Sequence, residues 1–203
     1  MANWHQTWTT AITKPSVNTY KAMCQDPKAN AWRPTIWIVL AGLVAAILSI
    51  GADYLTHQVA YSTFTSNDLA LLAGPRLLIG MIGSLIGFVI FVGVQHLIAL
   101  RLGGHGTFGQ QAYVVGAIMA PLLILTTVVA SLPIISVASP VLALFGLVIE
   151  VTAIKAVYSF GWTKALLSSF VIWVLIALVL LVLLLILIGP SIGNVFSNIG
   201  TFI

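Results

Sequence analysis

Charged residues are scarce in this chain of 203 residues. Aspartate, glutamate, lysine and arginine together make up 6% of it, whereas they make up about 25% of a typical soluble domain. Hydrophobic residues make up 60%. This composition excludes an ordinary water-soluble domain and a disordered chain, and it predicts an integral membrane protein whose first partner is the lipid bilayer.

Motifs for chemistry are also missing. Cys24 is the single cysteine, so no disulfide can form within the chain. His5, His57, His96 and His105 show no metal-ligand spacing, and the four acidic residues are scattered along the chain. The basic residues form no stripe with aromatic residues, which excludes a nucleic-acid partner. We therefore expect no metal, no cofactor and no catalytic site, and hence no enzyme.

Long apolar runs dominate what is present, and a transmembrane helix needs about 20 such residues. Pro133 and Pro140 divide the uncharged stretch 102–149 into two runs, and Gly189 with Pro190 closes the last. Pro121 should kink the third span and free a carbonyl group. The sequence predicts an all-α membrane bundle of five helices. The expected spans are Pro34–Leu55, Leu77–Leu100, Gln111–Leu132, Ser136–Tyr158 and Ala165–Ile188.

The basic residues give the bundle an orientation. With five spans, Arg76 alone falls on the side of Asp53, and all the other lysines and arginines fall on the opposite side. By the positive-inside rule, the N-terminus is cytoplasmic and the C-terminus lies outside, in what we expect to be a bacterial cytoplasmic membrane. The cytoplasmic basic residues are Lys14, Lys21, Lys28, Arg33, Arg101, Lys155 and Lys164.

The N-terminal segment is neither apolar enough to span nor polar enough to float free. It contains no apolar run that would form a cleavable signal peptide. Trp4, Trp8 and Tyr20 lie on helix faces with lysines around them, in short pieces divided by Pro15 and Pro27, which predicts interfacial helices. These helices anchor the segment or dock a partner. The expected divisions are a cytoplasmic segment 1–33, a membrane domain 34–190 and a tail 191–203.

Few polar residues lie inside the predicted spans, and three of them are candidates for chemistry: Gln95 and His96 in the second span, and Glu150 in the fourth. At about 1.5 Å of rise per residue, His96 and Glu150 fall at similar depths, about 7 Å from the cytoplasmic boundary. They could therefore meet as a hydrogen-bonded pair. Glu150 is then a structural contact between helices, part of a proton or ion relay, or a contact to a ligand or partner.

Glycines in the second span predict close helix packing. Gly83 and Gly87 form a G-x-x-x-G motif, and Gly80 lies one turn earlier. Such a face lets another helix approach closely, either a span of this chain or one of a second protein.

Gly103, Gly104 and Gly106 cluster between the second and third spans. A phosphate-binding loop is disfavoured, because no strand precedes them and no Gly-Lys-Ser/Thr follows. They predict a cytoplasmic turn that needs positive φ angles.

The same junction carries a family resemblance. The residues from Gln95 to Gln110 resemble the junction of the second and third spans in bacterial Yip1-domain proteins, H-x-x-A-x-x-x-G-G-x-G-[ST]-F-x-Q, with Pro121 following in the next span. Glu150 and the pair Lys164-Ala165 also resemble the family. The resemblance implies a five-span bundle with a cytoplasmic lead-in. Eukaryotic relatives bind prenylated Rab GTPases, but their D-L-Y-G-P motif is absent, so it implies no Rab binding.

Three functions remain open. The first is a non-enzymatic adaptor or accessory subunit that meets membrane-protein partners through its span surfaces and N-terminal helices. The second is a small transporter or lipid-handling protein that uses His96 and Glu150. The third is a membrane trafficking or membrane-shaping factor, as the eukaryotic relatives suggest.

Overall fold

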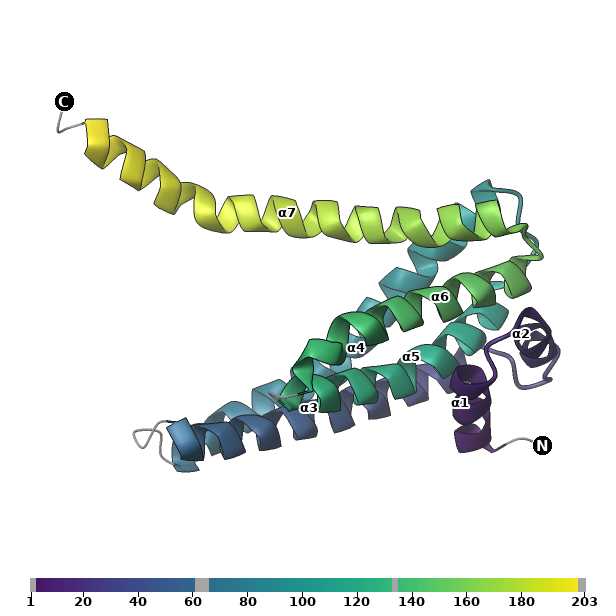
Figure 1. Ribbon diagram of the computed structural model, residues 1–203, viewed down its shortest axis with the longest axis horizontal. Helices are drawn as coiled ribbons and strands as arrows, with labels where there is room; N and C mark the ends of the chain where they lie inside the picture. The colour runs from purple at the N-terminus through teal and green to yellow at the C-terminus, as the bar shows by residue number, and fades with distance from the viewer. Residues whose placement is uncertain (1–2, 61–65, 133–134, 201–203) are drawn as a thin grey trace. The chain divides into compact units, whose positions relative to one another are not determined.

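The computed structural model describes the backbone of residues 3–60, 66–132 and 135–200. These residues form helices joined by short loops, with no strand among them (Figure 1). Five helices, α3 to α7, are long and apolar enough to cross a membrane, which confirms the predicted five-span bundle. The elements are α1 (Trp4–Thr13), α2 (Val17–Cys24), α3 (Trp32–Ala60), α4 (Ser66–Arg101), α5 (Phe108–Ser131), the short 3₁₀ helix η1 (Ser136–Ala138), α6 (Ser139–Tyr158) and α7 (Trp162–Gly200).

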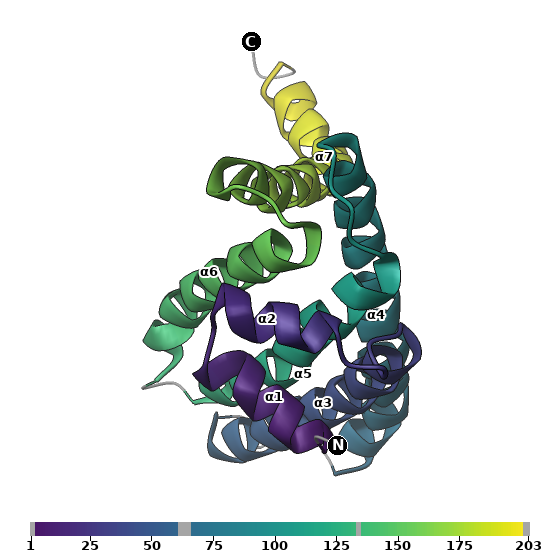
Figure 2. The same ribbon diagram turned by 90° about the vertical axis from the view of Figure 1, so that its right-hand side faces the viewer.

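The chain divides into two compact units, Met1–Ser169 and Phe170–Ile203. In the first unit, α3 packs against α4 and α5, and α5 also packs against α6. The helices α1 and α2 lie across α5, and α2 also contacts α6 (Figure 2). We call α1 and α2 the N-terminal cap. The second unit is the remainder of α7, whose described side chains are apolar from Phe170 to Ile188.

Small residues explain how closely α3 approaches its neighbours. A Cβ atom on Gly42 would lie 2.2 Å from the backbone oxygen of Gly80, and one on Gly80 would lie 2.6 Å from the Cβ of Ala46. On α5, a Cβ on Gly116 would lie 2.4 Å from Pro34. Without a hydrophobic driving force between helices in lipid, such close van der Waals packing holds spans together.

Several predicted boundaries differ from the structure. The helix α4 begins at Ser66, well before the predicted Leu77, and it continues through Pro75. The helix α7 continues past the predicted span end at Ile188 to Gly200, and residues 201–203 lie outside the described part. The predicted divisions 1–33, 34–190 and 191–203 stay predictions. A proline removes one helical hydrogen bond, but neighbouring groups can satisfy the freed carbonyl, so it need not end a membrane helix.

Pro121 lies inside α5, which continues through it to Ser131. The kink expected at this proline stays a prediction.

Candidate functional site

A chain of hydrogen bonds links α4, α5 and α6 inside the bundle. Gln95 Nε2 donates to Glu150 Oε1 at 2.5 Å, and Gln111 Nε2 donates to Gln95 Oε1 at 2.8 Å. Tyr158 then donates its hydroxyl proton to Gln111 Oε1 at 2.7 Å. His96 Nδ1 pairs with the same Tyr158 hydroxyl. We call these five residues the polar network.

The polar network has a direction. Because Tyr158 gives its hydroxyl proton to Gln111, its oxygen must accept the hydrogen bond from His96 Nδ1. Every donor from His96 onward therefore points along the chain toward the carboxyl group of Glu150. The bonds reinforce one another, because each one polarises the next in a low-dielectric interior.

The network is poorly suited to carry protons. Its two middle members, Gln95 and Gln111, are amides, in which the oxygen only accepts and the nitrogen only donates. A proton that reached the oxygen of Gln111 could not be passed on from that oxygen, so the amides do not relay protons as a water or a carboxyl group does. Gln95 and Gln111 are also completely buried, and Tyr158 is 1% exposed. These side chains do not line an open path for a substrate.

The predicted hydrogen bond between His96 and Glu150 is replaced by this longer route. Adjacent residues on a helix point about 100° apart, so when Gln95 faces Glu150, His96 faces elsewhere. The two sequence candidates are joined through Gln95, Gln111 and Tyr158 instead. Sequence reasoning missed Gln111 and Tyr158, although a glutamine inside a predicted span was a usable signal.

The glycine cluster holds Tyr158 in place. The helix α4 ends in a Schellman motif, in which the N–H of Gly104 donates to the carbonyl of Ala99 and that of Gly103 to the carbonyl of Leu100, with φ of +84° at Gly103. This confirms that Gly103 supplies a positive φ. The other two glycines allow close approach instead, because a Cβ on Gly104 would lie 2.6 Å from Tyr158 and one on Gly106 would lie 2.7 Å from the backbone oxygen of Val157.

The residues Thr107 to Gln110 form the start of α5, and one of them packs against the polar network. The Thr107 side chain accepts from the N–H of Gln110 at 3.3 Å, and the Gln110 side chain accepts from the N–H of Thr107 at 3.1 Å, which forms a capping box. The Phe108 ring lies edge-on to His96, with the ring centroids 5.7 Å apart. The junction motif is therefore a device that ends α4, starts α5 and positions the polar network.

The N-terminal cap is fastened to the same end of the bundle. Tyr113 donates to Asp26 at 3.3 Å, and Gln110 donates to the carbonyl of Cys24 at 3.4 Å. The Trp8 ring lies edge-on to Trp37, with centroids 6.2 Å apart. Aromatic pairs of this kind contribute about 0.5–1.5 kcal/mol beyond their buried area.

Of the three aromatic anchors predicted for the interface, Tyr20 is a correction. It is completely buried, and its hydroxyl donates to the carbonyl of Ala11 at 2.8 Å, so it ties α2 to α1 rather than facing lipid headgroups. Trp8 is partly buried against Trp37, and Trp4 remains 55% exposed. An interfacial role for Trp4 stays a prediction.

Basic side chains surround this end. Lys164 Nζ donates to the carbonyl of Leu102 at 2.9 Å, and Lys155 Nζ lies 4.2 Å from the centroid of the Trp162 ring. At the opposite end of the bundle, Arg76 forms a salt bridge with Asp53 at 2.5 Å. The side chains described, in residues 3–55, 73–132 and 135–188, include no cluster of three metal-binding residues.

The three glycines of α4 that were predicted to pack against another helix, Gly80, Gly83 and Gly87, divide into two kinds. Gly80 is in close contact with α3, as described above. A Cβ on Gly87 would meet nothing within 4 Å, and one on Gly83 would meet only Ile79 of the same helix, at 3.8 Å. Within the described residues of the first unit, the G-x-x-x-G motif therefore has no close partner.

Comparison with known proteins identifies one family. The family model described as the Yip1 domain matches residues 9–184, which is most of the chain. No curated protein and no solved structure matches the chain. The match confirms the resemblance seen at the junction residues.

Proposed function

The chain belongs to the Yip1 domain family, and from this premise we propose that it is a non-enzymatic adaptor or accessory subunit of a larger membrane protein assembly. One observation carries the proposal: the backbone of α4 is open to a partner helix at Gly83 and Gly87. The partner that fits these glycines is another apolar transmembrane helix with small residues on the face that it presents.

The surroundings of the two glycines fit such a partner. Ile79, Ile82 and Ile86 are 69%, 53% and 53% exposed, and they flank the glycines along one side of α4. A face of glycines flanked by branched apolar residues favours helix association through close packing. We call this side of α4, from Ile79 to Ile90, the glycine face.

The transporter alternative has less support. It needs His96 and Glu150 beside a path for a substrate, but both take part in a network whose middle members are buried. The arrangement favours a structural role for these side chains, holding three spans in register. The Glu150 carboxyl group is then a contact between helices.

The glycine face can be tested by enlarging it. We expect the double substitution Gly83→Leu and Gly87→Leu to lower recovery of a co-purifying partner by about tenfold, which corresponds to about 1.4 kcal/mol of association free energy. The chain itself should still fold, because a Cβ atom at either position meets no other helix within the described first unit. The measurement is quantitative mass spectrometry of proteins that co-purify from native membranes in mild detergent.

Gly74→Leu is the matched control, because a Cβ at Gly74 on the same helix also meets nothing within 4 Å and lies outside the glycine face. Unchanged recovery in the double variant, or isolation of the wild-type chain without any partner, contradicts the proposal.

We also propose that the N-terminal cap lies in the cytoplasm and that the membrane is a bacterial cytoplasmic membrane. The proposed orientation is supported by the basic side chains at the end of the bundle that carries the N-terminal cap, because basic residues favour the cytoplasmic side of a membrane. We expect a cysteine at His105 to react with a membrane-impermeant maleimide only after the cells are opened, and a cysteine at Tyr54 to react in intact cells. Both residues are exposed and lie near opposite ends of the bundle.

Native Cys24 will add little background, because burial raises the pKa of its thiol to about 11, and the thiol form is nearly unreactive near neutral pH. The wild-type chain is the control for this background. Labelling of both introduced cysteines from the same side would be incompatible with the proposed orientation.

A further inference from the structure

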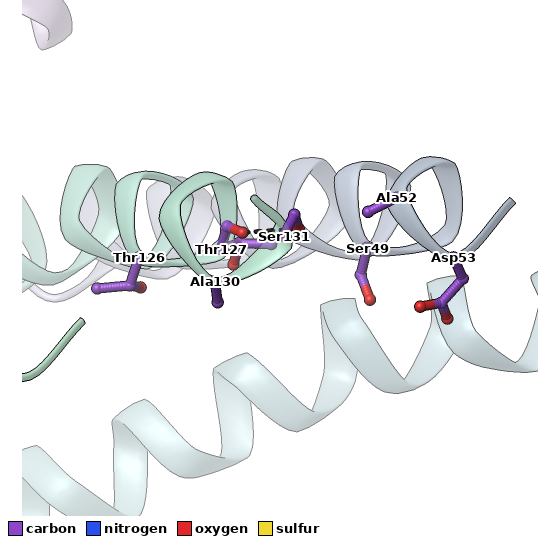
Figure 3. A pocket seen from close by; sticks show the side chains of 7 residues that line it. All are labelled: Ser49, Ala52, Asp53, Thr126, Thr127, Ala130 and Ser131. Carbon is purple, nitrogen blue, oxygen red and sulfur yellow. Dashed lines mark hydrogen bonds between the residues drawn. The ribbon is translucent and has the colours of Figure 1, made fainter. Parts of the chain in front are cut away.

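A cleft opens at the end of the bundle opposite the N-terminal cap. One part of the cleft has a volume of about 510 Å³ and lies between α3 and α5 (Figure 3). It continues between α3 and α4 into a second hollow of about 680 Å³, since both parts are lined by Ser49, Asp53 and Thr127. Each volume falls within the range of about 300–1,000 Å³ typical of ligand sites.

The mouth of the cleft carries one salt bridge. Arg76 Nη1 and Asp53 Oδ2 lie 2.5 Å apart, and their side chains are 45% and 39% exposed. Ion pairs this exposed contribute little to stability. A ligand that carries both charges can therefore replace the pair at small cost, with its anion on Arg76 and its cation on Asp53.

The hydroxyl groups of the α5 wall offer acceptors rather than donors. Thr126 donates its hydroxyl proton to the carbonyl of Leu122 or Leu123, Thr127 donates to that of Leu123, and Ser131 donates to that of Thr127. A hydroxyl oxygen that has donated its proton keeps two lone pairs. The α5 wall of the cleft thus presents lone pairs beside the Asp53 carboxylate, which suits a ligand with several N–H donors.

The cleft changes character with depth. Its charged residues are Asp53 and Arg76, and farther along the helices toward the N-terminal cap it is lined by Ala46, Ile79 and Leu123. A molecule that fits this gradient has a charged head and an apolar tail. A phospholipid in the surrounding bilayer is such a molecule.

We propose that this cleft binds a phospholipid whose headgroup is a phosphate ester bearing a primary ammonium group. The phosphate faces Arg76, and the ammonium faces Asp53 and the hydroxyl oxygens of Thr127 and Ser131. The acyl chains follow Ala46 and Leu123. A quaternary ammonium headgroup has no N–H to donate, and a glycerol headgroup has no cation for Asp53, so neither matches the lining.

The test uses the purified full-length protein in mild detergent with equal amounts of phosphatidylethanolamine, phosphatidylcholine and phosphatidylglycerol. Native mass spectrometry then measures which lipid is retained. We expect phosphatidylethanolamine to be retained about tenfold better than either competitor. We expect Asp53→Asn to abolish this preference, and Ser49→Phe to reduce binding of all three lipids by filling the cleft without changing its charge.

Asp26→Asn is the matched control, because it removes an acid at the opposite end of the bundle and should leave the preference unchanged. Equal retention of the three lipids by the wild-type protein would overturn the proposal, and so would an unchanged preference in Asp53→Asn. Soluble phosphoethanolamine is a further competitor, which we expect to displace the lipid weakly because it lacks a tail. Displacement as effective as that by the lipid would show a site for the free ester instead.

Discussion

The substitution Gln95→Leu is expected to lower the free energy of unfolding by about 2–3 kcal/mol, because hydrogen bonds to ionisable groups in buried sites are among the strongest that proteins make. Gln95 is completely buried and both donates to Glu150 and accepts from Gln111. Leucine has a similar size but can do neither. The change in the free energy of unfolding can be measured by titrating the purified protein with SDS and monitoring its helix content by circular dichroism.

Gln25→Leu is the matched control, because Gln25 is exposed at the end of α2 and its replacement should change stability by less than about 0.5 kcal/mol. A double-mutant cycle with Glu150→Leu sharpens the test. Replacing both partners of a buried hydrogen bond by apolar residues costs less than removing one. We therefore expect the double variant to be more stable than the sum of the two single losses predicts, and strict additivity would refute a direct coupling.

Gly104→Ala is expected to be nearly as damaging, with a loss of about 1–3 kcal/mol from overpacking. The added methyl group would lie 2.6 Å from the Tyr158 ring, 2.9 Å from Phe160 and 3.0 Å from the carbonyl oxygen of Ala99. The backbone oxygen cannot move without opening the end of α4. Displacement of Tyr158 would also break its hydrogen bonds to Gln111 and His96.

Gly109→Ala is the natural comparison, because it makes the same change five residues away, in the first turn of α5. A Cβ there would lie 3.5 Å from its nearest neighbour, which is an ordinary contact. We expect this variant to match or exceed wild-type stability, since alanine favours a helix over glycine by up to about 1 kcal/mol. The same SDS titration compares the two, and equal losses would mean that the contact with Tyr158 is unimportant.

The number and type of the helices followed directly from composition. Runs of apolar residues near 20 in length have few alternatives to a membrane span, and Pro133 with Pro140 gave the break that sets the count at five. The helix ends were harder to predict, because α4 and α7 extend beyond their apolar runs. Hydropathy reports the part of a helix that lies in lipid, not where its hydrogen bonding stops.

The polar network could be predicted only in part. Sequence position placed Gln95 and Glu150 at the same level of the bundle, as their hydrogen bond requires, but the partners of each side chain depend on how its helix is rotated about its axis. Tyr158 stands at the end of a span, where a tyrosine usually indicates an interface. Tyr158 is buried because Gly104 and Gly106 leave room for its ring, and this contact cannot be read from the sequence of α6 alone.

Tyr20 was misassigned for a related reason. A tyrosine among lysines on a short helix is typical of an interfacial segment. In the structure, its ring turns toward α1 and its hydroxyl satisfies a carbonyl there. The pattern of residue types is the same for a helix that lies on lipid and for one that lies on protein.

The polar network has a consequence for biosynthesis. Gln95 and Gln111 are translated before Glu150 and Tyr158, so α4 and α5 enter the bilayer while α6 is still being made. Until α6 joins them, α4 and α5 can form only the hydrogen bond between Gln111 and Gln95, because Glu150 and Tyr158 both lie on α6. A hairpin of α4 and α5 alone therefore leaves a donor of Gln95 and the acceptor of Gln111 without the partners that α6 supplies.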